Sequence, residues 1–125
     1  MDTSIFIAGE QQRPIGASPD GGSRISVATL TELGVGVRRA ADDVTREVRA
    51  STLANARRFI SLPYDERVAE RLADLLAAAR THRCRAGAMD AIIAATALAH
   101  DLTIWTSGDD FDVLAELAPD LRVHR

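Results

Sequence analysis

The sequence contains no lysine and a single cysteine, Cys84. One cysteine excludes an intrachain disulfide, and it leaves no cysteine cluster with the spacing of a structural zinc site. Aromatic residues make up only 4% of the chain, which disfavours a surface built for base stacking. All fifteen basic residues are arginines and they face 18 acids, so the net charge of −3 disfavours broad electrostatic attachment to nucleic acid.

Long apolar runs are also missing. No stretch approaches about 18 consecutive apolar residues, and the N-terminus lacks the basic-then-apolar pattern of a secretion signal. We therefore expect no membrane span and no export, which places the protein in the cytoplasm. The 125 residues, 46% of them hydrophobic, suffice for a single globular domain over residues 1–125 with a buried core.

Short apolar runs alternate with segments of helical periodicity. The runs predict strands at 25–28, 59–62, 102–105 and 121–124. The periodic segments predict helices at 29–39, 42–59, 62–83 and 89–99, and a last helix that Pro119 ends. The face predicted for the helix at 62–83 consists of Val68, Leu72, Leu75, Leu76 and Ala79. Short apolar strands between helices predict an α/β fold, namely a three-layer α/β/α domain with a mainly parallel central sheet.

Acidic residues stand where such a sheet would place its functional groups. Functional sites of parallel α/β sheets lie beyond the carboxyl ends of the strands. Carboxylates gathered there repel one another unless a cation neutralises them, and Mg²⁺ prefers oxygen ligands. We therefore predict a divalent-metal site formed by Asp2, Glu32, Asp90 and the pair Asp109 and Asp110.

Each acid also has a purely structural interpretation. Glu32 and Asp110 each stand three residues after a Thr or Ser, which is the spacing of a helix capping box. Asp2 could cap a helix that starts at Ser4, and Asp90 could stabilise a helix N-terminus through the macrodipole. Capping does not explain why all four acids fall at the same end of the predicted sheet.

Four segments carry chemistry in a fixed order along the chain: DTSIFIA at 2–8, ATLTELGVG at 28–36, AMDAIIAATAL at 88–98 and TSGDDF at 106–111. In this order they resemble the motifs of PIN-domain ribonucleases, specifically the VapC-type toxins of bacterial toxin–antitoxin pairs. The resemblance covers essentially the whole chain and implies that Asp2, Glu32 and Asp90 are the three acids that hold the metal.

Two features depart from the family's pattern. Gly108 stands where members often carry an acid or Asn, so Asp110 is expected to supply the fourth acid, with Asp109 as its alternative. The family also has an apolar strand before its first Asp, whereas this sequence has only Met1 there. The first strand is therefore expected to be truncated or to lie upstream.

The expected function is metal-dependent endonucleolytic hydrolysis of RNA. Mg²⁺, or Mn²⁺, held by Asp2 and Asp90 would activate a water and offset the charge of the transition state, while Glu32 and Asp110 position that water or a second ion. The hydroxyls expected to orient these carboxylates are those of Thr3, Ser4 and Thr106. The arginines expected to contact RNA phosphates are Arg83 and Arg85, followed by Arg38 and Arg39.

The resemblance also implies partners. They are an RNA substrate, with tRNA among the candidates, a second copy in a homodimer, and an inhibitory VapB-type antitoxin. Gly34 and Gly36 would permit close helix approach around Val35 in an interface. Two other interpretations stay open: a catalytically inactive interaction module that keeps the acids as caps, and a receiver-type phosphoacceptor domain, which the lack of lysine disfavours.

Overall fold

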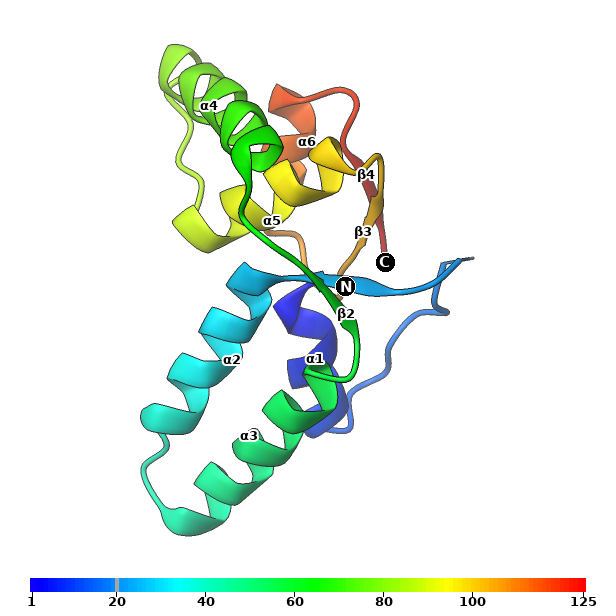
Figure 1. The fold of residues 1–125 in the computed structure, drawn as a ribbon, viewed down its shortest axis with the longest axis vertical. Helices are drawn as coiled ribbons and strands as arrows, with labels where there is room; N and C mark the ends of the chain where they lie inside the picture. The colour runs from blue at the N-terminus through cyan, green and yellow to red at the C-terminus, as the bar shows by residue number, and fades with distance from the viewer. Residues whose placement is uncertain (20) are drawn as a thin grey trace.

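A computed structural model describes residues 1–19 and 21–125, and it shows the predicted alternation of helices and strands (Figure 1). The loop predicted over Gln12–Ser23 contains neither helix nor strand in its described part, and Asp20 lies outside the described residues. None of the helices in the described ranges is long and apolar enough to cross a membrane. The elements are α1 (Thr3–Glu10), β1 (Arg24–Ser26), α2 (Val27–Arg38), α3 (Asp43–Ala56), β2 (Ile60–Leu62), α4 (Glu66–Thr81), α5 (Ala88–Ala99), β3 (Thr103–Trp105), α6 (Asp112–Leu117) and β4 (Arg122–His124).

The strands are parallel, as predicted, but in the described residues they form two pairs, β1 with β2 and β3 with β4. The first two residues of the chain lie between these pairs. The amino group of Met1 donates to the backbone oxygen of Arg24 in β1 at 2.7 Å. The backbone N–H of Asp2 donates to the carbonyl of Trp105 in β3 at 2.8 Å. Asp2 is thereby fixed between two strands that are far apart in the sequence.

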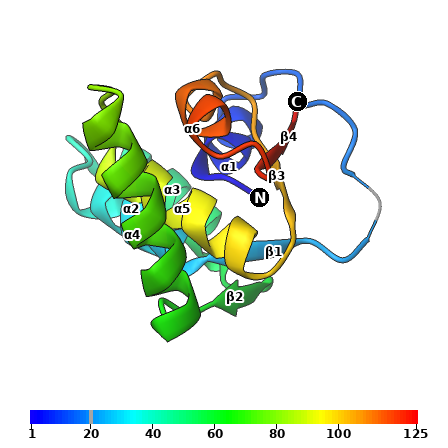
Figure 2. The same cartoon turned by 90° about the horizontal axis from the view of Figure 1, so that it is seen from above.

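Helices pack on the strands in two groups (Figures 1 and 2). α2 and α3 lie side by side and run in opposite directions, while α4, α5 and α6 pack together on the other side of the strands. Each group has its own buried cluster. The cluster around α2 and α3 contains Phe6, Ile25, Leu33, Leu53 and Ala56. The cluster around α5 contains Val68, Leu75, Ile93, Ile104, Phe111 and Leu114.

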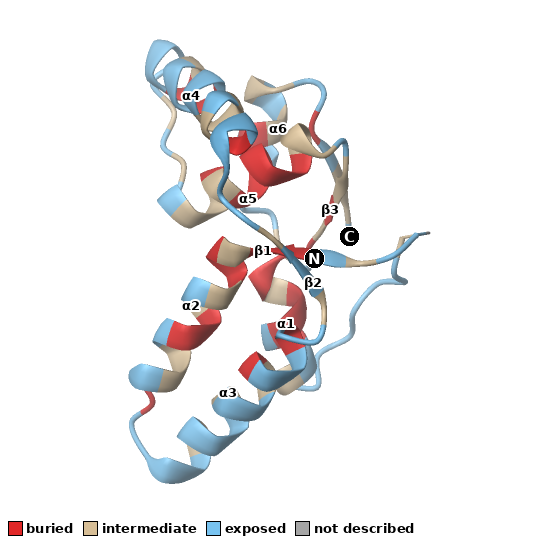
Figure 3. Ribbon diagram, in the orientation of Figure 1, coloured by how far each residue is buried: buried red, intermediate tan, exposed pale blue. Residues whose placement is uncertain are grey.

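α5 is the most deeply buried helix of the second group (Figure 3). Its middle consists mainly of alanine, and small side chains allow a helix to approach its neighbours closely. The residues of α5 that are buried are Ala91, Ile93, Ala94, Ala95, Thr96 and Ala97. Burial of this face leaves the first turn, with Asp90, at the edge of the strands.

Two local predictions are wrong. The strand predicted at 25–28 ends at Ser26, because the Ser26 hydroxyl accepts a hydrogen bond from the backbone N–H of Ala28 and so begins α2. On α4, Val68 and Leu75 are buried as predicted, but Leu76 is 49% exposed. One residue along a helix is a rotation of about 100°, which turns Leu76 away from the core that Leu75 enters.

Candidate metal centre

Three acidic side chains from distant parts of the chain meet beside the strands. Asp2 precedes α1, Glu32 lies on α2 and Asp90 lies in the first turn of α5; one ligand oxygen from each lies within 4.8 Å of the others. Two unit charges at that separation repel by about 3 kcal/mol at an effective dielectric constant of ~20. The structure thus brings together three of the four predicted acids in an arrangement that a cation would stabilise.

Asp2 is the most buried of the three, with 3% of its surface exposed. Its Oδ2 accepts hydrogen bonds from the backbone N–H of Ser4 and from the hydroxyl of Thr106, both at 3.1 Å. Asp2 therefore does cap a helix, as the structural interpretation allowed, although α1 begins at Thr3. Both of these hydrogen bonds end on Oδ2, so they do not occupy Oδ1.

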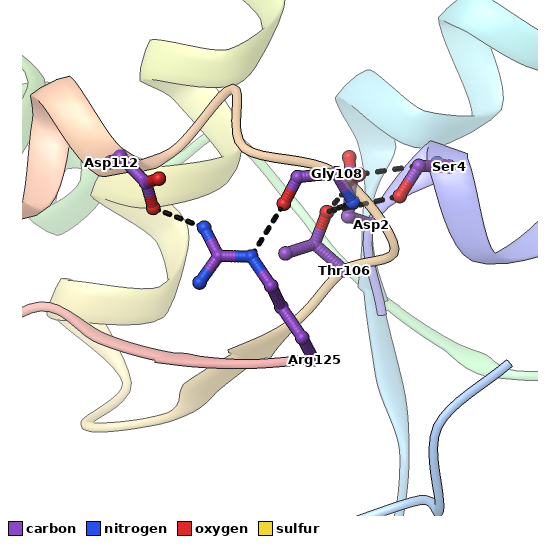
Figure 4. Close-up of polar contacts among 6 residues, drawn as sticks. All are labelled: Asp2, Ser4, Thr106, Gly108, Asp112 and Arg125. Atoms are coloured by element: carbon purple, nitrogen blue, oxygen red, sulfur yellow. Dashed lines mark hydrogen bonds and ion pairs between the residues drawn. The ribbon is translucent and has the colours of Figure 1, made fainter.

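Two of the three hydroxyls predicted to orient the carboxylates, those of Ser4 and Thr106, form a hydrogen-bonded chain that ends on Asp2 (Figure 4). Thr106 gives its only proton to Asp2, so the 3.0 Å contact between Ser4 and Thr106 has Ser4 as donor. The Ser4 hydroxyl in turn accepts from the backbone N–H of Ser107 at 2.9 Å. Each proton in this chain points toward the carboxylate, which holds Asp2 in one orientation.

Glu32 is held by the third predicted hydroxyl. The hydroxyl of Thr3 donates to Glu32 Oε1 at 2.6 Å. The capping-box interpretation of Glu32 is wrong, because Ser26 caps α2 and Glu32 lies in its second turn. Thr29, the cap in that interpretation, is fully buried inside the helix.

Asp90 carries the clearest electrostatic signature of the cluster. Burial of its carboxyl is the largest cause, and together with the negative charges of Asp2, Glu32 and Asp110, in that order, it raises the pKa of Asp90 to about 6. The helix N-terminus acts in the opposite direction, because its dipole favours a negative charge. Burial and repulsion outweigh the dipole, so the ionised carboxylate of Asp90 destabilises the metal-free folded protein. A carboxylate that only stabilised the helix N-terminus would have the opposite effect.

Gly87 leaves the space that the Asp90 carboxylate occupies, and it is not among the predicted site residues. Gly87 is the N-cap of α5, and a Cβ built on it would lie 3.1 Å from Asp90 Oδ2. Any other side chain at position 87 would therefore crowd the carboxylate. A glycine three residues before the acid of the third motif was the available signal.

The predicted fourth acid lies beside the cluster. Asp109 and Asp110 are both exposed on the loop after β3. Among the described side chains, the group of acids whose ligand oxygens lie within 4.8 Å of one another includes neither of them. Asp110 is close enough for its charge to raise the pKa of Asp90. The capping-box interpretation of Asp110 is wrong, because α6 begins at Asp112 without a side-chain cap. A Cβ at Gly108 would lie 3.3 Å from Asp110 Oδ2, so the glycine leaves room for this carboxylate.

The four predicted RNA-contacting arginines are exposed. Arg38 donates from Nη1 to the backbone oxygen of Gly34 at 3.0 Å, inside its own helix. Their contacts with RNA stay a prediction. They lie in two places, Arg83 and Arg85 in the segment before α5, and Arg38 and Arg39 at the C-terminal end of α2.

Comparison with known proteins identifies the family. Residues 1–117 match the PIN domain. The chain belongs to the PIN-domain family. This PIN-domain chain is 37% identical to Ribonuclease VapC4 of Mycobacterium tuberculosis over 98% of its own residues and 92% of the relative's. It is 42% identical to Ribonuclease VapC8 of the same species over 78% of its residues and 88% of the relative's.

A solved structure agrees with the sequence relatives. The crystal structure of VapBC-5 from Mycobacterium tuberculosis, a member of the VapBC family of toxin–antitoxin systems, matches this PIN domain with a TM-score of 0.84. Sequence identity is 32%, and the match covers 99% of this chain and 94% of the other. The resemblance to the VapC ribonuclease toxins is therefore confirmed, as is the α/β PIN-like fold.

Proposed function

We propose that this VapC-family protein hydrolyses RNA phosphodiester bonds endonucleolytically, in a metal-dependent reaction at the centre formed by Asp2, Glu32 and Asp90. The observation that carries the proposal is the approach of three carboxylates to within 4.8 Å. Capping explains only the position of Asp2, and it would not require the other two acids to approach it. An all-carboxylate donor set fits a hard divalent cation, so Mg²⁺ is the proposed ion and Mn²⁺ its substitute.

Each residue of the centre has a distinct task in this proposal. Bound Mg²⁺ would supply a water of lowered pKa and positive charge for the transition state. Asp2 and Asp90 are the proposed direct ligands, with Asp2 fixed by the hydroxyl chain from Ser4 and Thr106. Glu32, anchored by Thr3, is proposed to orient the attacking water through its second oxygen.

The fourth acid would act from the loop. We propose that Asp110, which already influences the charge state of Asp90, assists in positioning the water or a second ion, and that Asp109 is its alternative. We also propose that residues 1–125 act as one domain. The centre takes Asp2 and Glu32 from the side of α1 and α2, and Asp90 from α5, which belongs to the other buried cluster.

The partners follow from the family. The VapBC-5 structure of a relative supports a VapB-type antitoxin as the inhibitory partner of this chain. RNA, with tRNA among the candidates, is the proposed substrate, and Arg83, Arg85, Arg38 and Arg39 are its proposed phosphate contacts. A homodimer through α2 is proposed because Val35 is 46% exposed beside Gly34 and Gly36. We place this activity in the cytoplasm.

The test uses protein freed of any antitoxin and incubated with total RNA in Mg²⁺, in Mn²⁺ and in EDTA. Cleavage is expected with either metal and is expected to stop in EDTA. Asp90→Asn should lose cleavage, whereas Asp120→Asn, which removes the same charge from an exposed turn, should keep it. If the unaltered protein cleaves no RNA with either metal, the nuclease proposal is wrong and an inactive interaction module becomes the better interpretation.

A further inference from the structure

The start of the loop after β3, residues 106–111, is hydrogen-bonded to Ser4, whose hydroxyl belongs to the chain that ends on Asp2. The backbone N–H of Ser107 donates to the Ser4 hydroxyl at 2.9 Å, and the Ser107 hydroxyl donates to the carbonyl of Ser4 at 3.2 Å. The N–H of Gly108 donates to the hydroxyl of Thr106 at 3.2 Å. These bonds fix the start of the loop, but they do not reach Asp109 and Asp110 at its far end.

Arg125 fastens the opposite side of the loop (Figure 4). Its Nε donates to the carbonyl of Gly108 at 2.9 Å, and its Nη2 pairs with the carboxylate of Asp112 at the start of α6. One guanidinium therefore joins two points that flank Asp109 and Asp110. Nε and Nη2 lie on one edge of a rigid planar fork, so the two acceptors are held at a set spacing.

The backbone that carries Arg125 is itself fixed. The preceding carbonyl, that of His124, accepts from the N–H of Thr106 at 3.0 Å, and the His124 ring bonds the carbonyl of Ala17 at 2.9 Å. A Cβ at Gly16 would lie 2.7 Å from the carbonyl carbon of Arg125, so the segment around Gly16 packs directly on this residue. The guanidinium thus extends from an anchored base.

We propose that Arg125 is a positioning residue of the metal centre, which sets the place of the Asp110 carboxylate by holding the loop at Gly108 and Asp112. The inference rests on the proposed function, because it assigns a task to the fourth acid of that site. Asp110 Oδ2 lies over Gly108, the same residue whose carbonyl Arg125 binds. Movement of Gly108 would therefore carry Asp110 away from Asp90.

Arg122, the first residue of β4, offers a matched control three positions before Arg125. It bonds Asp101 through Nη1 at 2.9 Å and the carbonyl of the same residue through Nη2 at 2.7 Å, with a similarly exposed side chain. Arg122→Ala removes an equivalent surface ion pair from β4 without touching the loop of Asp110. The comparison separates loss of positioning from loss of an exposed salt bridge, which alone is worth little.

The kinetic test measures kcat and KM for cleavage of a single-site RNA oligonucleotide in Mn²⁺. Arg125→Ala is expected to lower kcat about tenfold with KM within about twofold, because the side chain acts on geometry and not on substrate binding. The kcat of Arg125→Lys should fall as far, because one ammonium cannot reproduce the planar fork of the guanidinium. In an Asp110→Asn background, Arg125→Ala should have no further effect. A rise in KM, an additive effect in that background, or an equal loss in Arg122→Ala would overturn the inference.

A second readout does not depend on cleavage. Heteronuclear ¹⁵N NOE values of the Asp109 and Asp110 amides should fall in Arg125→Ala and stay at the parent value in Arg122→Ala. Unchanged values in Arg125→Ala would refute the positioning role even if the protein cleaves RNA. Conversely, an inactive parent whose loop loosens in Arg125→Ala would refute the proposed nuclease function but leave the structural part of the inference standing.

Discussion

Replacement of Asp90 by Asn should stabilise the metal-free protein at neutral pH. The pKa of Asp90 is about 6 in the folded chain against an ordinary 3.8. Between these values the folded state binds more protons than the unfolded state, so the free energy of unfolding falls as the pH rises through this window. At pH 7 and above the full cost of the buried, repelled carboxylate is present, and below about pH 4 it is absent. Asn keeps the shape and removes the charge.

The magnitude follows from the pKa. A pKa of about 6 in place of 3.8 corresponds to about 3 kcal/mol. Asp90 is partly exposed, and solvent screening reduces this to about 1–2 kcal/mol. For a chain of this length that gain raises Tm by about 4–8 °C.

Urea unfolding followed by the fluorescence of Trp105, the one tryptophan of the chain, measures the effect. Parent, Asp90→Asn and the control Asp120→Asn are compared in EDTA at pH 7.5 and pH 4. The gain is expected for Asp90→Asn at pH 7.5 and should disappear at pH 4. The control reports the general effect of removing one negative charge from a chain of net charge −3.

A lower free energy of unfolding for Asp90→Asn than for the parent at pH 7.5 would contradict this prediction. If Asp90 only complemented the helix dipole of α5, Asp90→Asn would destabilise the protein at pH 7.5 by about 0.3–1 kcal/mol. Metal gives a second criterion, because Mn²⁺ at about 100 times its Kd should stabilise the parent by about 2.7 kcal/mol. Asp90→Asn should lose that response. A variant destabilised at pH 7.5 and a parent insensitive to metal would together exclude a metal centre at this cluster.

Two further substitutions test how the centre is held. Gly87→Ala places a Cβ 3.1 Å from Asp90 Oδ2 and should weaken Mn²⁺ binding several-fold, as measured by calorimetry. The control Gly36→Ala, whose Cβ would have its nearest neighbour at 3.9 Å, should leave the Mn²⁺ affinity unchanged. Equal affinities of the two variants would contradict the role of Gly87. Thr106→Val deletes the hydroxyl that donates to Asp2 and should lower the free energy of unfolding in urea by about 2 kcal/mol. Thr106→Ser keeps that hydroxyl and should retain most of the stability; a loss equal to that of Thr106→Val would show that packing, not the hydrogen bond, is what Thr106 contributes.

Local patterns were sufficient for most of the helices and strands and for most candidate residues. Apolar periodicity is a property of short segments, which is why the strands at β2, β3 and β4 and the helices α3, α4 and α5 follow the prediction closely. The motif order likewise pointed to Asp2, Glu32 and Asp90. α1 was not among the predicted helices, and the sequence allowed it only as the helix that Asp2 could cap.

Tertiary structure decided which of these residues meet and what holds them. Only packing of α2 and α5 against the strands shows that Glu32 and Asp90 approach Asp2 while Asp110 stays on the loop beside them. The capping boxes were plausible by spacing, yet the helices begin elsewhere, because Ser26 caps α2 and α6 starts after the loop. The partners of the Arg125 guanidinium, Asp112 and Gly108, lie 13 and 17 positions away in the sequence. No short sequence pattern could therefore indicate the role of Arg125. The sequence by itself determined the elements and the chemistry available to them, because both are encoded locally. The distances that turn separate acids into one centre arise only when segments far apart in the chain pack together.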